Sequence, residues 1–199
     1  MSPLRNYYLS NKRRQNHNKN VCLLCNNCTG GVILHDLGLP FNTPTINMGI
    51  RNQNEFLFFV ENIGNLLHED VYELDYMKYH HPAGYICYEG KTIDIVFTHY
   101  KSFEDGRKKW IERMKRVDLN HIYVLYEGPH VSEDFLERFS MLPYKKAVLS
   151  SYNESVEYSF YHGYHFYKDW KFGKILEYKS LLSVKRFLDD FDYVAFFND

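Results

Sequence analysis

The sequence has 199 residues, of which 45% are hydrophobic and 18% aromatic, and its net charge is −1 at pH 7 with neutral histidines. This composition excludes a largely disordered chain, and the length suits one domain with a sizeable core. The balanced charge argues against a nucleic-acid partner, and no apolar run reaches the ~20 residues that span a bilayer. The start of the chain lacks the apolar stretch of a secretory signal, which favours the cytoplasm.

Residues 1–19 are polar and basic, with Lys12-Arg13-Arg14 and many asparagines. We expect them to begin as a short helix and to continue as a solvated lead-in. A single α/β domain is then predicted over residues 20–199.

Residues 21–38 predict a strand, a tight polar turn and a helix. The run Val21-Cys22-Leu23-Leu24-Cys25 is uninterrupted and closed by turn residues, which is typical of a strand buried on both faces. Apolar residues at positions 33, 34 and 37 have helical spacing, and Gly38 stands where that helix should end. The turn therefore follows the carboxyl end of a central strand, where open α/β sheets bind their ligands.

The turn is unusually polar, and we interpret it as a ligand site. Its glycines permit close approach to the backbone, and the helix start offers unpaired N–H groups to an anion. It matches no named phosphate loop, and turn geometry alone would explain this composition about half of the time. The candidate ligand-binding residues are Asn26, Asn27, Cys28, Thr29, Gly30, Gly31 and His35, and Asp36 is a candidate catalytic base.

Three cysteines, Cys22, Cys25 and Cys28, have a spacing found in iron–sulfur and zinc sites. Residues three apart in a strand point to opposite faces, and the fourth cysteine, Cys87, is distant in sequence. We therefore predict no metal site and no cofactor. A nucleophilic role for Cys28 is also considered, because a helix dipole lowers the pKa of a thiol at its start, but no histidine lies nearby in sequence.

Strand and helix predictions alternate through the middle of the chain, which favours a mostly parallel sheet with right-handed crossovers. Strands are predicted at residues 45–50, 71–77, 92–100, 121–126 and 146–150, with 85–88 forming a hairpin with residue 92 onward. Helices are predicted over residues 55–67, after Ser102 and after Ser132. The fold class is therefore α/β, a Rossmann-like three-layer arrangement in which helices flank the sheet.

Residues 152–175 interrupt this alternation with many aromatic side chains and two histidines, His162 and His165. We expect an irregular, aromatic-packed insertion that covers one end of the sheet; the alternative is a platform on which a sugar ring or a base stacks. The two histidines could hold a metal only with further ligands, which the sequence does not indicate. A helix at 181–188 and a strand at 193–197 are predicted to end the chain.

A second polar turn, residues 99–102, lies between the strand predicted at 92–100 and the helix predicted after Ser102. Both turns should meet at one edge of the sheet, where they would hold a sugar phosphate or a nucleotide-sugar. His99 is the candidate general base, and Lys101 would neutralise phosphate. The other candidate ligand contacts are Tyr100, Ser102, Trp110 and Arg113.

Three segments carry a resemblance to a known family. They are Asn26-Asn27-Cys28-Thr29-Gly30-Gly31 with His35-Asp36-Leu37-Gly38, His99-Tyr100-Lys101-Ser102-Phe103 with Trp110 and Arg113, and Leu142-Pro143-Tyr144; the closing Phe191-Asp192-Tyr193 fits as well. From about residue 20 to residue 199, the sequence resembles a bacterial exopolysaccharide-biosynthesis family of uncharacterised proteins, encoded among capsule and surface-glycan genes. A bulky apolar residue often replaces Thr29 in that family, which implies a somewhat different ligand here.

The resemblance implies a pathway rather than a reaction, and two classes of function stay open. The first is a transferase that acts on a sugar or nucleotide-sugar at the two turns. The second is a non-catalytic subunit that binds a glycan or a partner enzyme of a polysaccharide-biosynthesis pathway. In either case other polysaccharide-biosynthesis proteins are the expected partners.

Overall fold

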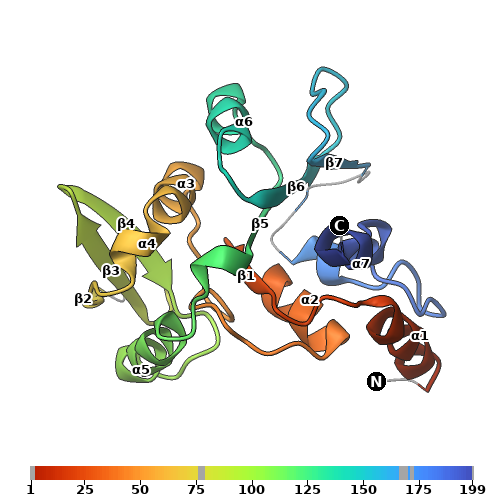
Figure 1. The fold of residues 1–199 in the computed structure, drawn as a ribbon, viewed down its shortest axis with the longest axis horizontal. Helices are drawn as coiled ribbons and strands as arrows, with labels where there is room; N and C mark the ends of the chain where they lie inside the picture. Colours follow the sequence, from red (N-terminus) through yellow and green to blue (C-terminus); the bar gives the residue numbers. More distant parts are fainter. Residues whose placement is uncertain (1–2, 76–78, 166–169, 171–172, 199) are drawn as a thin grey trace.

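The computed structural model describes residues 3–75, 79–165, 170 and 173–198 (Figure 1). A four-stranded parallel sheet lies at its centre, in the order β1 (Cys22–Cys25), β5 (Ile122–Glu127), β6 (Lys145–Ser151) and β7 (Tyr161–Tyr164). A separate antiparallel sheet contains β2 (Tyr72–Leu74), β3 (Ala83–Tyr88) and β4 (Lys91–Val96). The predicted α/β class with a helix-flanked parallel sheet is confirmed.

Both faces of the parallel sheet are covered, because successive strand residues point to opposite sides. In β1, Cys22 and Leu24 belong to one buried cluster, whereas Leu23 and Cys25 belong to another. Cys22 and Cys25 therefore face opposite ways, as predicted. The first cluster is completed by the small sheet and by helices α3 (Gln53–Glu61), α4 (Ile63–Leu66), α5 (Phe103–Met114) and α6 (Glu133–Ser140). The second is completed by helices α2 (Thr29–Leu37) and α7 (Tyr193–Asn198) and by the 3₁₀ turns η3 (Lys174–Leu176) and η4 (Phe187–Asp190).

Side-chain caps begin three of the predicted helices, and the helix predicted at 55–67 starts earlier and is divided at Asn62 into α3 and α4. Asn52, Ser102 and Ser132 each accept a hydrogen bond from a backbone N–H in the first turn of α3, α5 and α6. At the C-terminal end of α2, Gly38 adopts a left-handed backbone with φ of 67°. This conformation strains residues other than glycine.

The strand predicted at 45–50 is wrong. Threonine hydroxyls instead satisfy the outer edge of β1. Thr43 Oγ1 donates to the carbonyl oxygen of Leu23 at 2.7 Å, and the N–H of Cys25 donates to Thr45 Oγ1 at 3.2 Å. Because these hydroxyls take the place of backbone partners, the segment pairs with β1 without becoming a strand.

The strands predicted at 71–77 and 92–100 lie in the antiparallel sheet rather than in the parallel one, although residues 76–78 lie outside the described residues. The predicted hairpin between β3 and β4 is confirmed. Its turn residues Glu89 and Gly90 have positive φ angles of 49° and 72°, which match the twist of two paired strands.

The C-terminal predictions at 181–188 and 193–197 are wrong. The described residues 181–188 contain only the beginning of η4, and the aromatic run at 193–197 is helix α7. Asp192 explains the second error, since its carboxylate accepts hydrogen bonds from the N–H groups of Val194 (3.2 Å) and Ala195 (3.1 Å) and so caps a helix.

The aromatic segment 152–175 is partly regular. Its described residues contain β7, which pairs in parallel with β6 and extends the sheet, and the turn η3. Residues 166–169, 171 and 172 of this segment lie outside the described residues.

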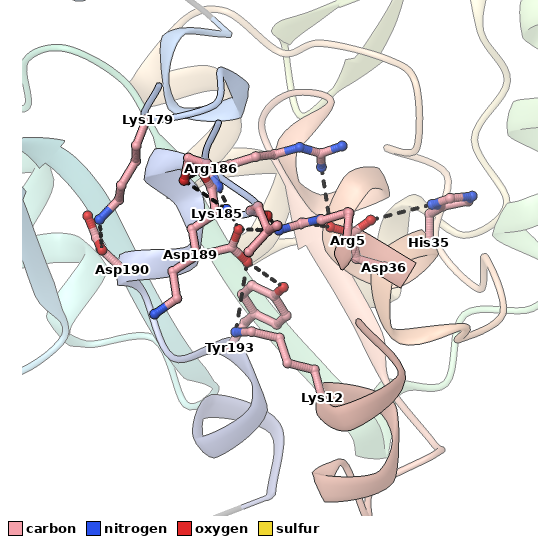
Figure 2. Close-up of polar contacts among 12 residues, drawn as sticks. Arg5, Lys12, His35, Asp36, Lys179, Lys185, Arg186, Asp189, Asp190 and Tyr193 are labelled. Atoms are coloured by element: carbon pink, nitrogen blue, oxygen red, sulfur yellow. Dashed lines mark hydrogen bonds and ion pairs between the residues drawn. The ribbon is translucent and has the colours of Figure 1, made fainter. Parts of the chain in front are cut away.

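The N-terminal segment is helix α1 (Pro3–Gln15), longer than the sequence predicts. Arg5 is 1% exposed and forms ion pairs with Asp36 at 2.6 Å and Asp189 at 2.5 Å (Figure 2). Arg186 also pairs with Asp36, at 3.3 Å. This buried cluster joins α1, α2 and η4, and hence the two ends of the chain. Within the described residues, no helix has both the length and the apolarity needed to cross a membrane.

Candidate functional site

A cavity of about 380 Å³ lies beyond the carboxyl ends of β1 and β5. Both polar turns predicted from the sequence contribute to its wall. The lining residues are Asn26, Asn27, Cys28, Thr29, Met48, Gly49, Arg51, Thr98, His99, Glu127, Gly173 and Leu176. The cavity thus stands at the edge of the parallel sheet where ligands are expected.

A short backbone junction brings the second turn to the parallel sheet. Gly49 pairs with Val96 through two hydrogen bonds of 2.9 and 2.8 Å, and the next residue, Ile50, donates its N–H to the carbonyl oxygen of Asn26 at 2.9 Å. Residues 49 and 50 therefore join β4 to the end of β1. His99 follows β4 by three residues and so reaches the cavity from the antiparallel sheet.

Asn26 holds the end of β1 against the end of β5. Its Oδ1 accepts the N–H of Glu127 at 2.8 Å, and its Nδ2 donates to the carbonyl oxygen of the same residue at 2.9 Å. The side-chain amide thus imitates a further backbone pair of the sheet. Both polar atoms of the Asn26 amide are used on the Glu127 backbone, so its role is to position Glu127.

The Glu127 carboxyl is the most unusual group in the cavity wall. Its residue is 0% exposed. Oε2 accepts hydrogen bonds from Asn27 Nδ2 and, at 3.4 Å, from Thr29 Oγ1, while Oε1 accepts one from Trp170 Nε1 at 2.8 Å. Burial raises the pKa of the carboxyl above its ordinary value, and the three hydrogen bonds oppose that change without reversing it.

Cys28 does not have the lowered pKa considered for it. Burial raises the pKa of its thiol, and the negative charge of Glu127 raises it further. The effect of the helix start is therefore outweighed, and the thiol stays protonated at neutral pH.

The two glycines of the first turn serve packing rather than ligand approach, and neither lines the cavity. A Cβ on Gly30 would lie 2.5 Å from the Cβ of Cys25, and one on Gly31 would lie 3.3 Å from Cγ2 of Ile46. Helix α2 can lie this close to β1 only because residue 30 has no side chain.

Several candidates of the second motif lie away from the cavity lining. Arg113 is buried, and its Nη1 donates to the carbonyl oxygen of Ile46 at 2.6 Å and to the hydroxyl of Tyr100 at 3.0 Å. Trp110 is 0% exposed and belongs to the core. The Arg113 bond to Ile46 fixes α5 against the 41–50 segment, and neither Arg113 nor Trp110 lines the cavity.

Ser102 and Lys101 also lie outside the lining. Ser102 accepts the N–H of Asp105 at 3.2 Å as the cap of α5, and Lys101 is exposed to solvent. His99 is thus the residue of this turn that reaches the cavity.

His35 and Asp36 lie near the C-terminal end of α2, whereas the cavity is lined by Cys28 and Thr29 at its start. The His35 side chain is 63% exposed and its Nδ1 lies 3.6 Å from Asp36 Oδ1. Since Asp36 is 1% exposed and pairs with Arg5 and Arg186, it stabilises the joined chain ends and has no route to a ligand in this cavity.

Sequence reasoning missed Glu127, Arg51, Thr98 and the apolar part of the wall. Glu127 could have been found, because it is an acidic residue directly after the apolar run 122–126, and the strand-end argument applied to the two turns holds for it as well. Arg51 follows the junction with β4, and its guanidinium lies 5.3 Å from the ring centre of Tyr79.

The cavity combines a carboxyl, an imidazole, a guanidinium and amide groups in a partly apolar enclosure. Such a set can bind hydroxyl and phosphate groups and can move a proton. Among the residues with described positions, no three His, Cys, Asp or Glu side chains converge as a metal ion would require.

Comparison with known proteins identifies the family. Residues 3–198 match a family described as a domain of unknown function, DUF1919. A protein from Haemophilus influenzae, named uncharacterized protein, is 30% identical over 188 residues, which are 94% of this chain and 88% of that protein. The match includes α1, whereas the sequence analysis began the domain at residue 20. The chain therefore belongs to the DUF1919 family.

Proposed function

We propose that this protein is a transferase of surface-polysaccharide biosynthesis, which moves a sugar from a nucleotide-sugar to an acceptor hydroxyl. The observation that carries the proposal is the Glu127 carboxyl, a buried acid with a raised pKa in the wall of a strand-end cavity. Acids perturbed in this way within clefts are typical of proton-transfer groups. The pathway is inferred from the family resemblance of the two turn motifs.

The size and polarity of the cavity suit an activated sugar. A volume of about 380 Å³ lies within the ~300–1,000 Å³ usual for small-molecule sites. Arg51 and His99 in the wall would contact the diphosphate, because charged donors bind phosphate oxygens strongly. Met48 and Leu176 would pack against the apolar face of a sugar ring or a base.

Glu127 has the capacity to accept a proton from the acceptor. A carboxylate offers about four acceptor positions, and the described hydrogen bonds from Asn27, Thr29 and Trp170 occupy three of them. Among the described residues, no donor takes the fourth position, which is on Oε1. Its raised pKa makes the carboxylate a stronger base than that of an ordinary glutamate.

The reaction then follows from these positions. The acceptor oxygen forms a bond to the anomeric carbon while the bond from that carbon to the diphosphate oxygen breaks. The diphosphate leaves with the bonding electron pair, next to Arg51 and His99. Glu127 takes the proton of the acceptor hydroxyl.

The test is release of nucleoside diphosphate from UDP-glucose, UDP-N-acetylglucosamine and GDP-mannose, with water or added glycan as acceptor. The wild-type protein is expected to turn over at least one donor, and Glu127→Gln to lose about 10²–10⁴-fold in rate, the usual contribution of a proton-transfer group. Glu133→Gln on the exposed start of α6 is the control. Binding of a donor without turnover would support the non-catalytic sugar-binding function instead.

A further inference from the structure

Residues 178–186 leave the body of the protein as a narrow excursion. Tyr178 pairs with Arg186 in an antiparallel bridge, and the N–H of Lys179 donates to the carbonyl oxygen of Lys185 at 3.1 Å. The chain therefore goes out and returns at the same place. Residues 181 and 182 lie at the far end of this excursion.

That far end consists of two leucines. Leu181 is 105% exposed and Leu182 is 95% exposed. Side chains exposed to this degree contribute nothing to the core, and both apolar groups are fully in contact with water, which is unfavourable. We call these two residues the leucine tip.

Helix α1 lies beside this excursion (Figure 1). The two segments are in contact, because Arg5 Nη1 donates to the carbonyl oxygen of Val184 at 2.8 Å. Helix α1 adds two exposed apolar side chains, Leu4 at 69% and Tyr7 at 67% exposure. Half of the strongly exposed large hydrophobic side chains among the described residues thus belong to these two adjoining segments.

The same segments are basic. Residues 3–15 and 178–186 together contain seven Lys or Arg residues and no Asp or Glu, although the whole chain has a net charge of −1. Buried Asp36 and Asp189 offset Arg5 and Arg186, and Asp190 pairs with Lys179 (Figure 2). Lys185 remains exposed next to the leucine tip, and the exposed Arg13 and Arg14 end α1.

We infer that the protein binds the surface of an anionic membrane by inserting the leucine tip among the headgroups. A protruding apolar tip with basic neighbours supplies the two signals, apolar insertion and attraction to anionic lipid, that peripheral attachment requires. A protein partner would need a matching pocket within a far larger interface. The convex shape of the tip therefore favours a lipid surface, and this inference does not depend on the proposed function.

Flotation with lipid vesicles tests the inference on the full chain. Vesicles of phosphatidylcholine with about one-third phosphatidylglycerol are compared with vesicles of phosphatidylcholine alone. We expect binding to the anionic vesicles that weakens in about 0.5 M salt. The double variant Leu181→Ser/Leu182→Ser is expected to bind at least about tenfold more weakly, since each leucine loses its transfer to an apolar phase.

Met141→Ser is the matched control, because Met141 is 70% exposed at the end of α6, on another part of the molecule (Figure 1). It should bind vesicles like the wild type, and all variants should keep the wild-type melting temperature. Absence of vesicle binding by the wild type, or equal binding by the double variant, would overturn the inference. Sedimentation velocity gives a further contrary outcome: self-association that the double variant abolishes, without vesicle binding, would assign the tip to a second copy of the chain.

Discussion

The side-chain amide of Asn26 hydrogen-bonds both the N–H and the carbonyl oxygen of Glu127, at 2.8 and 2.9 Å. This pairing continues the β1–β5 register, in which Cys25 is opposite Leu125, beyond the last backbone pair. Glu127 is thereby fixed at the cavity wall by an interaction outside its own side chain. Asn26 therefore positions Glu127 through its backbone, whereas other side chains bond to its carboxyl group.

Asn26→Ala should lower the free energy of unfolding by about 1–3 kcal/mol, because a buried N–H of Glu127 loses its partner. Asn54→Ala, an exposed position in α3, should change it by less than about 0.5 kcal/mol. Urea unfolding of both variants measures the difference. Equal stability of the two would show that the amide bridge contributes nothing.

Glu127 should make stability depend on pH in a defined direction. Its folded pKa is raised above an unfolded value of about 4.3. Between those two pKa values the folded protein keeps the proton that the unfolded chain has lost, so the free energy of unfolding falls as pH rises. The contribution of the neutral form is fully present below about pH 4.3 and is lost as pH rises through the folded pKa.

Glu127→Gln removes this titration. The stability of the wild type relative to Glu127→Gln should therefore decrease with rising pH across that window, as measured by urea unfolding at a series of pH values. The amide of the variant meets the donors of Asn27 and Trp170, which adds an offset that does not vary with pH. A relative stability that is constant or that increases with pH would contradict the raised pKa.

Gly30→Ala and Gly31→Ala should differ in severity. The added methyl group would lie 2.5 Å from Cys25 Cβ in the first variant and 3.3 Å from an Ile46 methyl group in the second. Overpacking of this kind costs about 1–3 kcal/mol, so Gly30→Ala should melt well below Gly31→Ala. If the two variants melt at similar temperatures and only Gly30→Ala loses ligand binding, Gly30 contacts the ligand instead.

The buried cluster around Arg5 should respond to the loss of one partner. Asp189→Asn leaves Arg5 with less compensation, and breaking a buried ion pair costs about 3–5 kcal/mol. Glu112→Gln breaks the half-exposed pair of Lys109 and Glu112, 2.7 Å apart, and should lower the free energy of unfolding far less, because solvent screens an exposed pair. Chemical denaturation compares the two, and a small effect of Asp189→Asn would mean that the cluster is not a clamp between the chain ends.

The regular parts of the fold could be predicted because local chemistry decides them. Uninterrupted apolar runs identified β1 and β5, and Ser102 and Ser132 marked helix starts. The failures occurred where tertiary contacts replace local preference. Thr43 and Thr45 occupy the edge of β1 with hydroxyl groups, and no periodicity reveals that a side chain will act as a strand partner.

The site was predicted in part for a similar reason. Strand-end reasoning found Asn27 and His99, which the structure brings to one cavity. It did not separate residues that face the cavity from neighbours that face the core, such as Gly30 and Trp110, since that depends on how α2 and α5 pack. The basic surface around Lys185 was hidden as well, because its two segments lie at opposite ends of the chain.

Calorimetric titration of nucleotide-sugars into the Arg51→Ala variant tests the central claim most directly. Arg51 lines the cavity, and loss of a charge-assisted hydrogen bond costs about 1.5–3 kcal/mol, or roughly ten- to a hundredfold in affinity. Arg116→Ala, at a 43% exposed side chain beyond the end of α5, should bind like the wild type. We expect UDP-glucose, UDP-N-acetylglucosamine or GDP-mannose to bind the wild type and to bind Arg51→Ala more weakly by that factor. Equal binding to both proteins, or no binding of any of the three to the wild type, would show that the cavity is not a nucleotide-sugar site.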